Sequence, residues 1–341
     1  MKKILIISCF LFFFPNFTFA NELNIFTSRH YDSDIQLYEK FTSITGIKIN
    51  IISGEDAALE KRMIEEGKDT KADLYITADA GRLGLFDKKG MFQNSISPII
   101  KAKVPENFRS DNWTGIAKRA RIIFYAKDRV SSDEIKNLRY EDLSKPNWKN
   151  RITIRQSNNI YNQSLVASLI SNNGIAKTEE WVNGFVKNFA RDPQDNDRGQ
   201  ILAVASGEAD LAIANTYYYA LMLSGQKGKD QQEAAKKVTP FFPNQNDRGA
   251  HMNISGAGVL KTSKNHENAI KLLEFLLTKE SQEHIVNNTF EYPIVENIEP
   301  NKLIKNTSLG NNFIQDLKTP VKEYSIFQEE ALKLMLKAGW K

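Results

Sequence analysis

The chain has 341 residues, of which 41% are hydrophobic and 26% are charged. This composition is typical of a globular protein and excludes a disordered chain, and the length leaves room for about two domains. The formal net charge of +5 comes from dispersed lysines and arginines, so nucleic acid is not an expected partner.

Residues 1–20 have the pattern of a cleaved secretory signal peptide. Two lysines precede an apolar run over 4–14, and small residues end the segment at Ala20. Cys9 would suit a lipoprotein signal, but the apolar run continues well beyond it, which favours cleavage after Ala20. Cleavage would remove two lysines and no acidic residue, which lowers the net charge from +5 to +3, and it would also remove the only cysteine. We therefore expect a periplasmic protein with no disulfide and no thiolate.

Strand-like runs and helical patterns alternate through the first part of the mature chain. The expected strands are 23–26, 47–52 and 74–77, and the expected helices are about 32–46, 56–66 and 80–89. In the first helix, Asp32 or Ser33 is expected to be the cap, and the apolar residues fall at Ile35, Tyr38, Phe41 and Ile44. The alternation is typical of an α/β fold with a parallel sheet.

A second alternating block follows a strand at 122–126, which we interpret as the crossing from one lobe to the other. The further strands that we expect are 151–155, 210–214, 238–242 and 251–260. The main helices begin at Tyr161, near Trp181, at Ile201, at Tyr217 after the N-cap residues Asn215 and Thr216, at Ala269, at Ser281 and at Ser325. The strand at 251–260 would return the chain to the first lobe.

Tyrosines occupy three of these strand-to-helix junctions. Tyr31 follows the first strand, Tyr161 follows the strand at 151–155, and Tyr217 and Tyr218 follow the strand at 210–214. Open α/β sheets bind ligands at this carboxyl edge. The alternative is packing, but consecutive helical residues point about 100° apart, so one face cannot bury all of them. We assign the adjacent Tyr219 to packing.

Phenol groups gathered at one point suit a hard, highly charged cation. A phenol has a pKa of about 10, so ionising one at pH 7 costs about 4 kcal/mol. A sugar would accept neutral hydroxyl groups, whereas Fe³⁺ would offset the cost because hard cations prefer oxygen donors and deprotonate them. Four phenolates around Fe³⁺ leave one negative charge, and Arg121 on the crossing strand is the best placed cation. Arg29 and Arg155 are interpreted as surface or supporting residues. His30 either faces solvent or contributes to the metal site.

Four motifs together resemble the bacterial periplasmic ferric-iron-binding proteins, which supply an ATP-driven iron importer. The motifs are Arg29-His-Tyr31, Arg119-Ala-Arg121, Tyr161 after an Arg-Gln loop, and Asn215-Thr-Tyr-Tyr218, within a similarity that covers residues 23–290. The resemblance implies that Tyr31, Tyr161, Tyr217 and Tyr218 bind Fe³⁺, with Arg121 and His30 near it. Many members also hold an exogenous anion. This chain departs from their pattern at residues 29–31, so the resemblance does not decide whether an anion is needed.

The resemblance also implies a two-lobed, type 2 periplasmic-binding-protein fold with two crossing strands as hinges. We expect residues 21–118 and about 244–290 to form the N-terminal lobe, and about 119–243 and 291–341 to form the C-terminal lobe. The iron site would lie in the cleft between them. The expected partner is an inner-membrane ABC permease, and the protein is expected to act as a monomer.

Two other classes of protein are alternatives to a ferric-iron-binding protein. A type 2 binding protein for a small anion, a polyamine or a sugar would use the tyrosines for packing or hydrogen bonding. Cationic ligands would need acidic residues, but Asp32 and Asp34 in these loops are expected to cap a helix. A secreted hydrolase would need a motif such as G-x-S-x-G or H-E-x-x-H, and the sequence contains neither, so we do not expect an enzyme.

Overall fold

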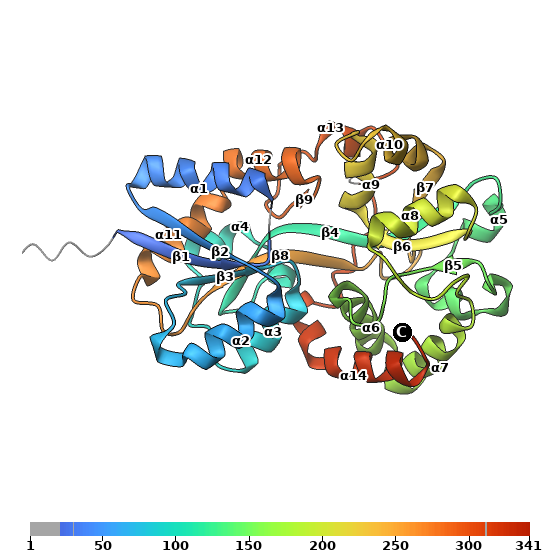
Figure 1. The fold of residues 1–341 in the computed structure, drawn as a ribbon, viewed down its shortest axis with the longest axis horizontal. Coiled ribbons are helices and arrows are strands. Elements are labelled where there is room, and N and C mark those ends of the chain that lie inside the picture. The colour runs from blue at the N-terminus through green and yellow to red at the C-terminus, as the bar shows by residue number, and fades with distance from the viewer. Residues whose placement is uncertain (1–20, 30, 311) are drawn as a thin grey trace, which may run out of the picture.

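The computed structural model describes residues 21–29, 31–310 and 312–341. Two lobes lie side by side and are joined by the long strands β4 (Trp113–Ala126) and β8 (Met252–Val259) (Figure 1). The predicted signal peptide lies outside the described residues. Within these ranges, every helix is too short or too polar to cross a bilayer.

The first lobe is built on three parallel strands, as the alternating sequence pattern predicts. Strand β1 lies between β2 and β3, and β8 pairs with β3 in the antiparallel direction. The strands are β1 (Glu22–Thr27), β2 (Lys48–Ser53) and β3 (Leu74–Thr77), and the helices that follow are α1 (Asp32–Thr45), α2 (Asp56–Glu66), α3 (Ala80–Lys88) and α4 (Pro98–Lys103). Because the three strands are parallel, their carboxyl ends lie at one edge of the sheet.

Strand β4 belongs to both lobes. Its first part pairs with β8, whereas residues from Arg121 onward pair with β6 (Leu211–Asn215) and β7 (Val238–Phe241) of the second lobe. The sequence predicts a strand only over 122–126, so the prediction missed residues 113–121. The missed part contains Arg119 and Arg121, which are both buried, and buried charges hide a strand from a search for apolar runs.

The second lobe repeats the arrangement of strand followed by helix. Strand β5 (Ile152–Thr153) pairs in parallel with β6, and the order of strands in the described part of the sheet is β2-β1-β3-β8-β4-β6-β5. The helices of this region are α5 (Ser132–Ile135), α6 (Ile160–Asn173), α7 (Ile175–Val186), α8 (Asp197–Ser206), α9 (Thr216–Leu223) and α10 (Lys229–Lys236). Helix α6 follows β5 and α9 follows β6, so both helices begin at the carboxyl edge of this sheet.

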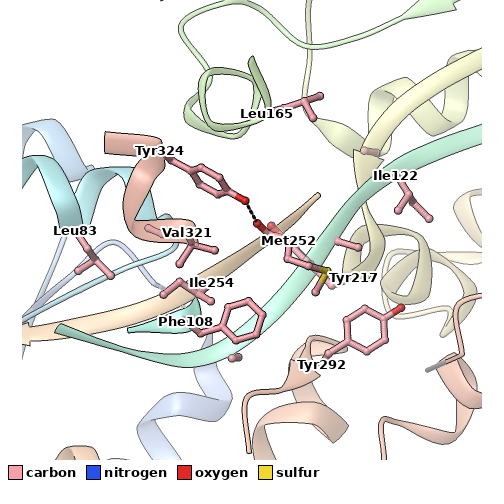
Figure 2. Packing of buried hydrophobic residues seen from close by; sticks show 14 of the residues in the cluster. Leu83, Phe108, Ile122, Leu165, Tyr217, Met252, Ile254, Tyr292, Val321 and Tyr324 are labelled. Atoms are coloured by element: carbon pink, nitrogen blue, oxygen red, sulfur yellow. Dashed lines mark hydrogen bonds between the residues drawn. The ribbon is translucent and has the colours of Figure 1, made fainter. Parts of the chain in front are cut away.

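The C-terminal part of the chain fastens the two lobes together. Its elements are α11 (His266–Leu276), α12 (Lys279–Thr289), β9 (Tyr292–Pro293), α13 (Lys302–Lys305) and α14 (Tyr324–Lys337). Helix α14 packs against α6 of the second lobe and α3 of the first. Figure 2 shows how its Tyr324 is held: the hydroxyl group donates a hydrogen bond of 2.8 Å to the carbonyl oxygen of Met252 on β8. Short 3₁₀ helices occur at Gly67–Asp69, Glu106–Phe108, Tyr140–Ser144, Pro146–Trp148 and Val321–Glu323.

Helix α1 buries only part of the apolar set that the sequence suggested. Ile35 and Ile44 are 45% and 64% exposed, whereas Leu37, Tyr38 and Phe41 are buried. A spacing of three residues falls short of the 3.6 residues in a helical turn, so positions nine residues apart drift to opposite sides. The buried set instead follows the i, i+3, i+4, i+7 pattern that starts at Asp34.

Candidate metal centre

The predicted tyrosines all lie at the start of a helix. Tyr31 directly precedes α1, Tyr161 is the second residue of α6, and Tyr217 and Tyr218 are the second and third residues of α9. Each helix follows a strand, so strand direction and helix start together place these side chains. His30, the other residue proposed beside Tyr31, lies outside the described residues.

The four phenol groups line one cavity between the lobes, with a volume of about 510 Å³. The hydroxyl group of Tyr217 donates to that of Tyr161 at 3.4 Å, and the ring centroids of Tyr217 and Tyr218 are 4.2 Å apart. Tyr31 comes from the first lobe, yet its ionisation is coupled electrostatically to Tyr161 and Tyr218. The structure thus brings together all four residues that the sequence singled out. That they bind a metal remains a prediction at this point.

Tyr219 has the packing role that was assigned to it. Its side chain is buried, its hydroxyl group donates to the carbonyl oxygen of Val238 at 3.0 Å, and its ring centroid lies 5.2 Å from that of Phe124. Three consecutive tyrosines therefore point in different directions, and only Tyr217 and Tyr218 reach the cavity.

Without a cation, Tyr31, Tyr217 and Tyr218 are held in the neutral form. Burial raises the pKa of Tyr31 well above its usual value, and the nearby carboxylate of Glu291 raises it further. Burial also raises the pKa of Tyr217, and the neighbouring Tyr161 and Tyr218 act in the same direction. The pKa of Tyr218 is raised by burial and by Tyr161. Two adjacent phenolates repel each other, so the cluster ionises only if a positive charge is placed among the oxygens.

Asn215 is the N-cap residue of α9, as expected, but the N-cap residue of α1 is not the one that the sequence suggested. Asp32 and Ser33 were expected to cap α1, but both lie inside the helix, and the capping position is Tyr31 with an extended backbone (φ −86°, ψ 129°). Asp34, also expected to cap, is buried and accepts a hydrogen bond of 2.7 Å from Nε of Arg29. A buried arginine nearby gives this carboxylate a stronger partner than a backbone amide.

Arg29 and Glu291 form the core of a buried charge network behind Tyr31. Nη1 of Arg29 lies 2.5 Å from a carboxylate oxygen of Glu291, and its guanidinium carbon lies 4.6 Å from the centre of the Tyr31 ring. Arg119 also contacts Glu291, at 3.4 Å, and both arginines donate to the hydroxyl oxygen of Ser255. Burial would raise the pKa of Glu291, but the two arginines hold it below its usual value.

Arg119 is the cation from β4 that lies beside the tyrosines. Its guanidinium carbon is 5.4 Å from the centre of the Tyr161 ring, and Arg155 lies at 5.6 Å from the same ring. Burial would lower the pKa of Arg119, but Tyr161, Glu291 and Tyr217 raise it. Its Nε and Nη2 are buried and have no hydrogen-bond partner within the described part of the chain. Sequence reasoning included Arg119 in a motif but gave it no role at the site, and it did not select Glu291.

Arg121, the cation that the sequence favoured, is occupied by other groups. Its guanidinium contacts the carboxylate of Asp197 at 3.0 Å, the amide oxygen of Asn162 at 2.6 Å and that of Asn215 at 3.1 Å. Asn215 is the residue before α9, but its side chain makes no cap hydrogen bond, because its oxygen accepts from Arg121 instead. Arg121 therefore fastens β4 to the helices that carry the tyrosines.

No conventional metal site competes with the phenol cluster in the described residues. Across residues 21–29, 31–310 and 312–341, no three histidine, cysteine, aspartate or glutamate side chains are grouped so that they could hold a metal ion. His251 is buried against the ring of Tyr324 at 4.9 Å, and His266 and His284 each bond a backbone carbonyl oxygen. These contacts give the three histidines a structural role.

A second cavity of about 790 Å³ adjoins the first and shares Tyr161 and Tyr218 with it. Arg82 and Arg155 line its walls together with the residues that precede α2 and α6. The tyrosines thus lie within a cleft that continues on both sides of them.

The sequence matches the family model of bacterial extracellular solute-binding proteins over residues 69–314. This chain belongs to that family. The solute-binding protein is 45% identical over 322 residues to iron uptake protein A1 of Synechocystis, a match that covers 94% of this chain and 88% of the relative. It is 26% identical over 279 residues to the major ferric iron-binding protein of Neisseria meningitidis, covering 80% of this chain and 81% of the relative.

Solved structures agree with the fold of this solute-binding protein. The FutA (IdiA) protein of Trichodesmium, in complex with iron and citrate ligands, superposes with a TM-score of 0.88 at 44% identity, covering 94% of this chain and all of that one. The ferric binding protein from Campylobacter jejuni gives 0.87 at 34% identity, with the same coverage. The predicted two-lobed, type 2 periplasmic-binding-protein fold is confirmed. The exact lobe boundaries remain a prediction.

Proposed function

We propose that this protein captures ferric iron in the periplasm and delivers it to an inner-membrane ABC permease. Tyr31, Tyr161, Tyr217 and Tyr218 would bind the ion as phenolates. The observation that carries the proposal is that four phenol groups from three separate junctions line one cavity between the lobes. The names of the relatives from Synechocystis and Neisseria meningitidis support the choice of iron.

The chemistry of the cavity suits a cation of high charge. Burial and repulsion from neighbouring groups raise the pKa values of Tyr31, Tyr217 and Tyr218, which keeps these three residues protonated when no metal is present. A trivalent ion replaces these protons and stabilises the phenolates, because hard cations prefer charged oxygen donors. Four phenolates leave one negative charge around Fe³⁺. Arg119, which lies beside the ring of Tyr161, is placed to stabilise that charge.

Capture would proceed in two steps, without catalysis. Tyr161, Tyr217 and Tyr218 all belong to the second lobe and would hold the ion first. Closure of the lobes about β4 and β8 would then bring Tyr31 to the ion. Protonation of the ligands, opening on the permease or reduction to Fe²⁺ would each favour release, because a lower cation charge stabilises phenolates less.

Export requires the signal that the first 20 residues are proposed to supply. Cleavage after Ala20 would place the N-terminus of the mature protein just before β1, at the end of the first lobe far from the second (Figure 1). We propose that the mature protein acts as a monomer, because one chain supplies all four tyrosines of the proposed site.

Metal analysis and an absorption spectrum of the purified protein test the proposal. We expect one iron per chain and a visible phenolate-to-iron charge-transfer band, which a strong chelator removes and ferric iron restores. A protein that stays colourless after ferric loading would contradict the proposal.

The arginines in the cleft favour one alternative, a small anion as the transported solute. Arg29, Arg155 and Arg198 line the two cavities, together with Lys227 at the rim. Calorimetric titration of metal-free protein with citrate, phosphate and carbonate tests this alternative. Tight anion binding that does not depend on iron would favour it, whereas iron binding without such affinity would exclude it.

A further inference from the structure

A buried carboxylate that the iron site does not use lies where the two lobes meet. Asp79 is 0% exposed and precedes α3, and its Oδ1 accepts a hydrogen bond of 3.0 Å from the backbone amide of Arg82. Its Oδ2 accepts two further bonds of 2.7 Å. One comes from the side-chain amide of Asn253 on β8, and the other comes from the hydroxyl group of Ser164 on α6.

The bond from Ser164 joins the first lobe to the helix that carries Tyr161. Ser164 is fully buried and follows Tyr161 by three residues on α6, so the two side chains lie about one turn apart on neighbouring parts of the helix surface. A displacement of Ser164 along or about the helix axis therefore moves Tyr161 with it. Asp79, in contrast, is held by the first turn of α3 and by strand β8.

The packing around Asp79 leaves it little freedom. Gly81 of α3 faces Gln328 of α14, and a Cβ atom at Gly81 would lie 2.7 Å from the Gln328 side-chain oxygen and 2.9 Å from Oδ1 of Asp79. The side-chain nitrogen of Gln328 also lies 3.5 Å from the hydroxyl oxygen of Ser164. Helices α3, α6 and α14 thus meet at this carboxylate, and the contact holds α6 against the first lobe.

We propose that Asp79 is a positioning residue for the metal centre, and that through Ser164 it sets the place of Tyr161 relative to Tyr31. The role rests on the proposed function, because it matters only if these tyrosines bind one ion. Asp79 is not among the residues that line either of the two cavities. Its effect is to hold Tyr161 at the position from which it can bind the ion when the cleft is closed.

Two serines of α6 provide a matched test. Ser164→Ala removes the bond to Asp79, whereas Ser168→Ala removes a bond from an equally buried hydroxyl group to Leu165 within the same helix. Each variant is loaded with ferric iron, and the decay of the charge-transfer band is followed after addition of excess chelator. We expect release about tenfold faster in Ser164→Ala, the size of a hydrogen bond to a charged group, and within about twofold of wild type in Ser168→Ala.

A second variant separates positioning from stability. Asp79→Asn has a single acceptor oxygen, which cannot accept from Ser164 and Asn253 while also accepting from the backbone amide of Arg82, so we expect faster release and no further acceleration when Ser164→Ala is added to it. The melting temperature of each metal-free variant is measured alongside. Equal release from the two serine variants, with only a lower melting temperature in Ser164→Ala, would overturn the role of Asp79. A wild-type protein that stays colourless after loading would instead overturn the proposed function, and this role with it.

Discussion

The hydroxyl oxygens of Tyr161 and Tyr217 lie 3.4 Å apart, although 56 positions separate the two residues in the chain. At this distance, two neutral phenol groups share a hydrogen bond, whereas two phenolates would repel each other strongly. We therefore expect the pair to have two stable states, one protonated without a metal ion and the other ionised around a cation. The same repulsion between phenolates would act on Tyr31 and Tyr218.

Tyr218, a proposed ligand, can be tested against its neighbour Tyr219 as a control. Tyr218→Phe is expected to shift or bleach the charge-transfer band and to weaken iron binding by more than about 100-fold, above the range typical of residues outside the ligand shell. Tyr219→Phe removes only a hydroxyl group that donates to Val238, so it should keep the colour and lose a little stability. Absorption spectra and chelator competition check both variants. Equal colour loss in the two would argue against Tyr218 as a ligand.

The two arginines of β4 should have different effects when they are replaced. Arg119→Gln removes the charge beside Tyr161 but leaves Glu291 paired with Arg29, so we expect iron binding about tenfold weaker with a modest change in stability. Arg121→Gln leaves Asp197 without its main partner and should cost about 3–5 kcal/mol of the free energy of unfolding. Denaturant unfolding and iron competition measure the two effects. A larger loss of iron affinity in folded Arg121→Gln than in Arg119→Gln would reverse this assignment.

Iron binding should release protons, because the phenol groups are protonated in the metal-free cavity. Each coordinating tyrosine contributes one proton, so about four are expected per ion at neutral pH. Affinity should then fall as the pH falls, since protons compete with iron for the same oxygens. Addition of unbuffered ferric chelate in the presence of a pH indicator, corrected for the chelate itself, measures the release. Tyr218→Phe should release one proton fewer, and release of no protons would show that the phenol groups do not ionise.

The metal-free protein should lose stability at alkaline pH. Burial raises the pKa values of Tyr31, Tyr217 and Tyr218 in the folded state above that of an unfolded tyrosine. The folded state therefore retains protons that the unfolded chain loses, so this contribution is fully present below a pH of about 10 and declines as the pH rises above it. Urea unfolding between pH 8 and pH 11, chosen as about one to two units either side of that value, checks the prediction. Replacing Tyr217 with phenylalanine should reduce the decline, and an unchanged slope would contradict the argument.

Much of the fold could be predicted from local sequence patterns. The bounds of α2 and β3 agree with the prediction residue for residue, because apolar periodicity and flanking turn residues are local signals. The tyrosines were found for a related reason, since each lies where a strand pattern gives way to a helix pattern. Topology then brings the ends of those strands to the same region.

The charge network could not be predicted in the same way. Glu291 is 262 positions from Arg29 and 172 from Arg119, and no local pattern marks an acidic residue as the partner of two distant arginines. Arg121 was favoured for its place on the crossing strand. Its carboxylate partner, Asp197, is the first residue of α8, and only the tertiary structure reveals that the two residues meet.

The spacing of Arg119 and Arg121 along β4 limits how such a protein can change over evolution. The two residues are alternate positions on one strand, so their side chains emerge on the same side of it, one toward Glu291 and the other toward Asp197. A single inserted or deleted residue between them would turn one arginine to the opposite side and leave a buried acid without its counter-charge. Loops around the cleft can lengthen or shorten as the cargo changes, but the spacing of these two arginines has to be inherited intact.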